Sequence, residues 1–85
     1  MGNLIIKAAA MFCVPIKAIQ SERRHAEIVE ARNAIAWAAA QQGYRLCVVA
    51  RALNRDHSTI GYAVRHASRR AQTDVWYAER LAALL

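Results

Sequence analysis

The segment Arg55-Asp56-His57-Ser58-Thr59 gathers most of the side chains in this chain that could do chemistry. Asp56, His57 and Ser58 are the residue types of a hydrolytic triad. Triad members normally come from separate segments of a fold, because neighbouring residues at the start of a helix point in different directions. The sequence therefore argues against an enzyme, and these side chains are better considered as hydrogen-bonding groups.

Histidine and cysteine are the other residue types here that could bind a ligand such as a metal ion. Zinc sites place such residues at short, regular spacings. None of these spacings occurs among His25, His57, His66, Cys13 and Cys47. We therefore expect no metal ion and no other cofactor, and we expect both cysteines, which stand among apolar residues, to be buried thiols.

The segment that begins at Asp56 suits the start of a helix that reads DNA. An Asp carboxylate can accept a hydrogen bond from cytosine N4, and a His or Thr side chain can contact base edges or the thymine methyl group. Farther along, one face at helical spacing carries polar and basic residues that can reach bases and phosphates: Ser58, Tyr62, Arg65 and Arg69. The alternative for Asp56 is that it only caps the helix through the amides of Ser58 or Thr59.

Charge and composition agree with a nucleic-acid partner. Twelve Lys and Arg against six Asp and Glu give a formal charge of +6, which attracts a polyanion at long range. The 85 residues are enough for one domain, residues 1–85. The hydrophobic fraction is 56%, and much of it is Ala, which favours closely packed helices. Neither a bilayer-spanning stretch nor a signal peptide is apparent, so we expect the chain in the cytoplasm, associated with the nucleoid.

Apolar residues recur at helical spacing and predict five to six helices. The expected helices run from Leu4 to Phe12, Lys17 to Gln20, His25 to Gln42, Leu46 to Leu53 and His57 to Arg70, with a last helix capped by Thr73. The polar residues Asn54, Arg55 and Asp56 separate two short amphipathic helices, which is the sequence form of a helix-turn-helix. The expected fold class is all-α, a compact helical domain that contains a helix-turn-helix.

Apolar positions within these helices indicate the core. The expected buried residues are Ile28, Ala31, Ile35, Ala38, Ala39, Leu46, Val49, Ala50, Leu53, Ile60, Ala63, Val64, Ala67, Tyr77, Leu81 and Leu84. Trp37 and Trp76 are expected to anchor the Ala-rich faces. The alternative is a protein-interaction module, in which Trp37, Trp76, Tyr77, Leu84 and Leu85 line a docking surface.

The hexapeptide from Arg55 to Ile60 resembles the R-D-H-S/T-T-V/I signature of the C-terminal DNA-binding domain of DnaA-type bacterial replication initiators. The resemblance extends over roughly Leu4 to Ala67. It includes the Ser21-x-Arg23-Arg24 stretch, Arg32 in the following helix, and the pattern Leu46-x-x-Val49-Ala50-x-x-Leu53. The fold that it implies is like that of the Trp repressor and the DnaA C-terminal domain.

The resemblance also implies roles for individual residues. Arg24 would enter the minor groove, and the major groove would be read by Asp56, His57, Ser58 and Thr59. Backbone phosphates would be contacted by Arg23, Arg32, Arg55 and Arg65. An Arg on a loop before a helix suits a narrow minor groove, and the start of a helix suits the major groove.

Several positions depart from the family pattern. Leu53-Asn54 stands where the family usually has Gly-Gly, apparently one residue shorter, and Cys47 stands where it usually has Pro. We therefore expect a sequence preference that only partly overlaps with the nonameric box of the family. The chain also lacks a G-x-x-x-x-G-K-[ST] motif, so it cannot act as an ATP-driven initiator by itself.

These observations favour sequence-specific binding of double-stranded DNA by a bacterial transcription regulator, for example of phage-like or mobile-element genes. The alternative within the same family is a modulator of replication initiation that occupies initiator boxes. Expected partners are double-stranded DNA and, beyond it, a second copy of the chain, another domain of a longer protein or the transcription machinery, but no membrane.

Overall fold

The computed structural model describes residues 1–85 and consists of six α-helices without a strand. The helices are α1 (Gly2–Met11), α2 (Ile16–Ile19), α3 (Ala26–Gln41), α4 (Leu46–Leu53), α5 (His57–Ala71) and α6 (Val75–Leu84). The expected all-α class is confirmed, and every predicted helix is present with ends that differ by at most two residues.

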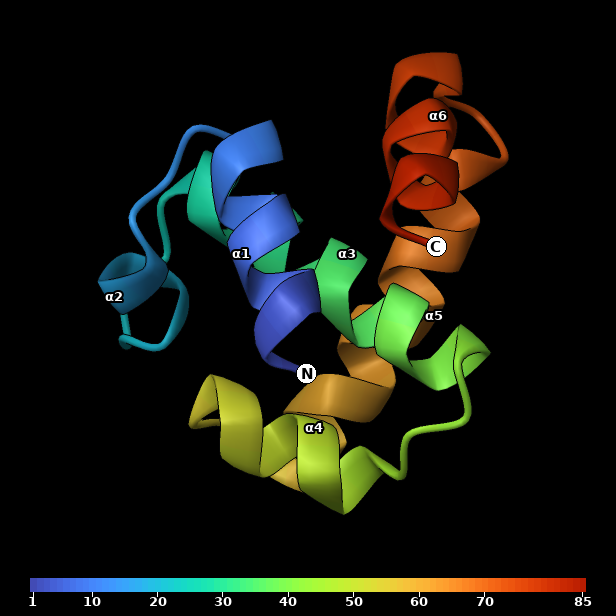
Figure 1. Ribbon diagram of the computed structural model, residues 1–85. Helices are drawn as coiled ribbons and strands as arrows, with labels where there is room; N and C mark the ends of the chain where they lie inside the picture. Colours follow the sequence, from blue (N-terminus) through green and yellow to red (C-terminus); the bar gives the residue numbers. More distant parts are fainter.

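The long helix α3 lies at the centre of the fold and packs against each of the other five helices. Figure 1 shows α1 and α2 on one side of it, α5 and α6 on the other, and α4 across one end. Small side chains allow this close packing, since Ala31, Ala34 and Ala38 are fully buried. Ile28 and Ile35 add larger side chains on the same helix, as the periodicity predicted.

Helices α4 and α5 form the helix-turn-helix, joined by Asn54, Arg55 and Asp56. Asn54 ends α4 in the left-handed conformation, with φ 56° and ψ 46°. This conformation is easy for Gly and tolerable for Asn, whose short polar side chain lowers the steric cost. The Gly-to-Asn departure from the family pattern is therefore compatible with a sharp turn, and the amide of Arg55 closes it by donating to the carbonyl of Ala50 at 2.8 Å.

Helix α6 is capped by Asp74 and not, as the sequence predicted, by Thr73. The Asp74 carboxylate accepts from the amide of Tyr77 at 3.1 Å, and this hydrogen bond is the main cause that lowers the pKa of Asp74. The Thr73 hydroxyl donates to the carbonyl of Arg70 instead. The predicted buried face of α6 is confirmed, because Tyr77, Leu81 and Leu84 all lie in the core.

Four residues that were expected in the core do not lie there fully. Trp76 has 76% of its surface exposed, because Tyr77 and Leu81 define the buried face and Trp76 points about 100° away from it. Trp37 and Val64 are only half-buried against the core. Leu46, the first residue of α4, is exposed.

The cysteines were also misplaced by the sequence pattern. Cys13 is exposed at a left-handed position, with φ 56°, immediately after the end of α1, and the buried side chains on either side of it are Phe12 and Val14. Cys47 is half-buried in the first turn of α4. Neither thiol is part of a disulfide.

Candidate nucleic-acid interface

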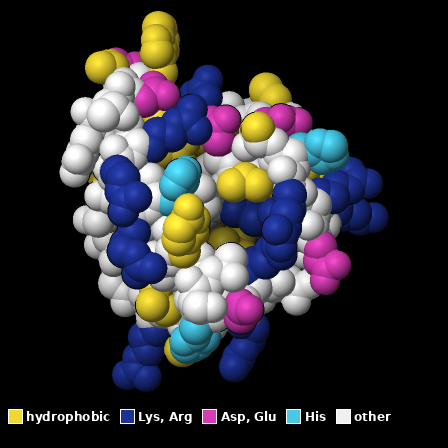
Figure 2. All heavy atoms as spheres, turned by 180° about the vertical axis from the view of Figure 1, so that it is seen from behind, with side chains coloured by type: hydrophobic (Ala, Val, Ile, Leu, Met, Phe, Trp, Pro, Cys, Tyr) yellow, Lys and Arg dark blue, Asp and Glu magenta, His cyan; other side chains and the backbone are white.

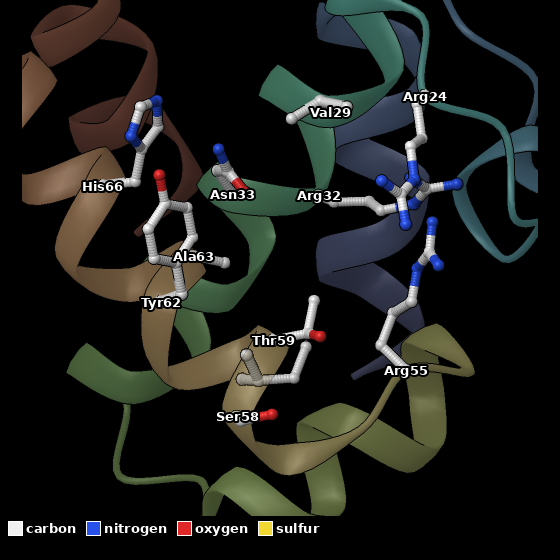
Figure 3. Close-up of a pocket in the computed structure, with 11 residues that line it drawn as sticks. Arg24, Val29, Arg32, Asn33, Arg55, Ser58, Thr59, Tyr62, Ala63 and His66 are labelled. Atoms are coloured by element: carbon white, nitrogen blue, oxygen red, sulfur yellow. The ribbon is translucent and has the colours of Figure 1, made fainter.

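One hollow of about 590 Å³ joins the segment before α3, one face of α3, the turn of the helix-turn-helix and the first half of α5. Its lining includes six of the predicted site residues: Arg24, Arg32, Arg55, Ser58, Thr59 and Tyr62. Figure 3 shows the three arginines on one side of this hollow and the residues of α5 on the other. Segments that are more than 30 residues apart in the chain thus converge on one site.

The remaining predicted residues lie at the surface outside the lining of the hollow. They are Arg23, Asp56, His57, Arg65 and Arg69, and all five are exposed. Figure 2 shows a face on which Lys and Arg side chains flank a hollow with apolar atoms at its floor. Tyr62, whose side chain is 60% exposed, stands on α5 beside this hollow.

The first turn of α5 is open to a ligand. Asp56 occupies the N-cap position in an extended conformation, but its carboxylate accepts no backbone amide hydrogen. It accepts instead from the hydroxyl of Thr59, at 3.1 Å. The capping interpretation of Asp56 therefore holds for its position and not for its hydrogen bond. The amides at the start of α5 remain available for acceptors, and the helix dipole adds partial positive charge there.

Three guanidinium groups concentrate positive charge at the hollow. Burial lowers the pKa of Arg32, and the charges of Arg55 and then Arg24 lower it further. None of the three forms a salt bridge, since the ion pairs of the chain join Arg70 to Glu30 and Asp74. An anion in the hollow would relieve this repulsion.

Arg32 lies deeper than a surface phosphate contact does. Only 7% of the residue is exposed, and its guanidinium donates to carbonyl oxygens of α2 and of the segment before α3. The Nε atom of Arg55 is buried without any hydrogen-bond partner. Arg32 is thus held inside the fold and Arg55 is half-buried, whereas Arg65 is exposed.

Two polar residues that the sequence analysis did not assign to the DNA-binding site also line the hollow, Asn33 and His66. The His66 ring stacks on Tyr62 with ring centroids 5.7 Å apart and an interplanar angle of 17°. His66 follows Tyr62 by four residues, so helical spacing alone could have placed it on this face. Asn33 lies next to Arg32 on α3, at a position that the apolar pattern gave no reason to inspect.

Comparison with known protein families identifies one match. The family model described as the bacterial DnaA protein helix-turn-helix matches residues 3–67. This range contains the segment before α3, the turn of the helix-turn-helix and most of α5, whereas α6 lies beyond it. A search among curated proteins gives no significant match. None of the six helices has the length and the apolar character that crossing a bilayer requires.

Proposed function

The chain belongs to the bacterial DnaA helix-turn-helix family, a family of non-catalytic DNA-binding domains, and from this premise we propose that it binds double-stranded DNA sequence-specifically as a bacterial transcription regulator. The observation that carries the proposal is the hollow itself. The exposed start of α5 and three arginines without acidic partners share one site. Sequence readout and attraction of phosphates need these two kinds of group side by side.

The start of α5 enters the major groove in this proposal. Asp56, His57 and Ser58 are exposed there and present acceptors and donors to base edges. Arg24, on the loop before α3, enters the neighbouring minor groove. Backbone phosphates are contacted by the basic residues around the site: Arg23, Arg55, Arg65 and Arg69.

The aromatic pair adds a contact that the signature residues do not provide. Tyr62 stacks on His66 and stands on the same face of α5 as Ser58 and Thr59. Its exposed ring offers apolar surface to a thymine methyl group or a deoxyribose, and its hydroxyl can donate to a phosphate.

The proposed way of regulating transcription is occupancy of an operator. The chain lacks a G-x-x-x-x-G-K-[ST] motif, so it supplies no ATP-driven motor, and occupancy of an operator is the simplest way in which it can act. A single helix-turn-helix binds DNA modestly, and a second copy on a neighbouring half-site would raise the affinity. We place this activity at the nucleoid in the cytoplasm.

Fluorescence anisotropy with two labelled duplexes tests the proposal. One duplex carries the nonameric initiator box of the family, the other a scrambled sequence of equal composition, and both are titrated across a salt series. We expect tighter binding to the box, with a preference that persists as salt rises. Equal affinity for both duplexes would contradict sequence-specific readout. Where the box is preferred, mapping of bound sites in cells distinguishes promoters from a replication origin.

A further inference from the structure

Arg32 donates four hydrogen bonds to backbone carbonyls that precede α3. Its Nε donates to Ile19 at 2.7 Å, its Nη1 to Arg23 at 2.6 Å, and its Nη2 to Ala18 at 3.0 Å and also to Ser21. A guanidinium has five N–H donors. Nearly all the N–H donors of Arg32 are therefore used in hydrogen bonds within the protein.

We propose that Arg32 is a positioning residue, which fixes the segment carrying Arg24 against the body of the domain and does not itself bind DNA phosphate. The proposal rests on the proposed function, since Arg24 is taken as a DNA contact. It replaces the phosphate role that resemblance to the family implied for Arg32. The burial of its guanidinium and the loss of free donors are the physical grounds for the replacement.

The four acceptors explain why an arginine stands at this position. Ala18 and Ile19 are the last two residues of α2. Arg32 is the one partner of the Ile19 carbonyl, whereas the Ala18 carbonyl also accepts from the amide and the hydroxyl of Ser21. Ser21 and Arg23 continue the chain toward α3. A planar, forked cation can satisfy several carbonyls that lie in different directions, whereas a lysine ammonium offers a single point of attachment.

The segment has two more restraints of its own. The Ser21 hydroxyl donates to the carbonyl of Ala18 at 2.6 Å and accepts from the amide of Arg23 at 3.2 Å. His25 starts α3 without any side-chain capping bond. Ser21 and Arg32 together are thus the polar groups that hold the backbone immediately before Arg24.

Side-chain bonds also link this segment to the helix-turn-helix. Gln20 donates from Nε2 to the carbonyl of Ala52 at 3.2 Å, and Asn54 donates from Nδ2 to the carbonyl of Gln20 at 3.4 Å. Asn54 is the left-handed residue that replaces a family glycine. These bonds therefore fix the distance between the segment with Arg24 and the turn before α5. A fixed distance is needed if Arg24 and the start of α5 are to enter two adjacent grooves at the same time.

Figure 3 shows the consequence at the site, where the side chains of Arg24, Arg32 and Arg55 gather on one side of the hollow. The charge of Arg32 still raises the positive potential there. The part that contacts DNA is the Arg24 side chain above it. Loss of the Arg32 guanidinium should therefore remove the contribution of Arg24 to DNA affinity.

The first test compares Arg32→Lys with Arg65→Lys by anisotropy on the box and the scrambled duplex. Both variants keep the charge, and lysine still binds phosphates as a point charge. We expect Arg32→Lys to lose about tenfold or more in affinity for the box, and Arg65→Lys to lose less than about threefold. Similar small losses for both variants would overturn the proposal.

A double-mutant cycle with Arg24→Ala distinguishes positioning from an independent contact. If Arg32 acts through Arg24, adding Arg24→Ala to Arg32→Lys lowers the affinity by less than about twofold. If both residues contact DNA separately, the two losses in affinity multiply, which contradicts positioning.

A measurement without DNA separates this inference from the proposed function. Backbone ¹⁵N relaxation of Arg23, Arg24 and His25 should give order parameters of about 0.85 in the wild type and below about 0.6 in Arg32→Lys. A rigid segment in folded Arg32→Lys would overturn the inference even if the wild type bound the box. If circular dichroism shows that Arg32→Lys is unfolded, Arg32→Gln takes its place in the relaxation measurement, with the same expected loss of order and the same contradicting result.

Discussion

The hydroxyl of Thr59 donates to Oδ1 of Asp56 at 3.1 Å, across the first turn of α5. The Asp56 carboxylate thus accepts from a side chain, whereas the carboxylate of a capping Asp accepts from backbone amides. Oδ2 of Asp56 remains free to accept from a base. The geometry thus keeps both the acceptor and the amides of the helix start available at the exposed end of α5.

Asp56→Ala should change the base preference of the domain more than its stability. The substitution removes the acceptor for cytosine N4, which should cost about 1–3 kcal/mol at particular base pairs and relax specificity there. Because no backbone amide depends on the carboxylate, the thermal unfolding curve should move little. Anisotropy against a panel of single base-pair variants checks this. A loss of equal size on every duplex, scrambled DNA included, would contradict base reading by Asp56.

Arg65→Ala should weaken binding to all duplexes alike. Arg65 is exposed on the free face of α5 and forms no salt bridge. Its removal should lower the slope of log affinity against log salt by about one, because one fewer phosphate counterion is released. Lys7→Ala is the matched control, as Lys7 is exposed on α1 and does not line the hollow. An unchanged slope for Arg65→Ala would remove this residue from the phosphate contacts.

Leu81→Ala should destabilise the domain although α6 lies beyond the residues that the family model matches. Leu81 is only 1% exposed within the core, and truncation of a buried Leu costs about 2–5 kcal/mol. Leu85→Ala is the control, because 57% of Leu85 is exposed. Urea unfolding of both variants should show a large shift of the midpoint for the first and almost none for the second. Equal midpoints would mean that α6 is not part of the cooperative unit.

Hydrophobic periodicity was sufficient to predict the helices, because apolar residues recur at helical spacing on their buried faces. Ile28 and Ile35 on α3 and Tyr77 and Leu81 on α6 follow this rule and lie in the core. The central helix α3 is buried on more than one face, since it packs against all five other helices. The size and apolar character of a residue, taken without its position around the helix, predicted burial less well. Trp76 is large and apolar, but the face of α6 is already fixed by Tyr77, and Trp76 is left in solvent.

The candidate site was predictable where side chains share one helix. Ser58, Thr59 and Tyr62 follow helical spacing and do line the hollow. The depth of Arg32 was not predictable in this way, because its partners are carbonyls at the end of α2 and in the loop that follows it, and their positions depend on how α2 packs. Spacing along one helix predicts the side of the helix on which a residue lies. Whether its side chain is exposed to solvent or bonded to backbone depends on the segment that packs beside it.

Tyr77→Phe should lower stability at neutral pH and also remove a loss of stability at high pH. The Tyr77 hydroxyl donates to the carbonyl of Glu30 at 3.1 Å, and loss of such a bond costs about 0.5–1.5 kcal/mol. Burial raises the pKa of Tyr77 to about 12, from the model-compound value of 10.0. Between these two values the unfolded chain releases the phenolic proton and the folded chain keeps it, so stability is complete below the lower value and falls as pH rises through the window. Urea unfolding at pH 9 and near pH 11.5 should therefore show a steeper decline for the wild type than for Tyr77→Phe, in which the other titrating groups are unchanged. Parallel declines of the two proteins would show that Tyr77 ionises as readily in the folded as in the unfolded chain.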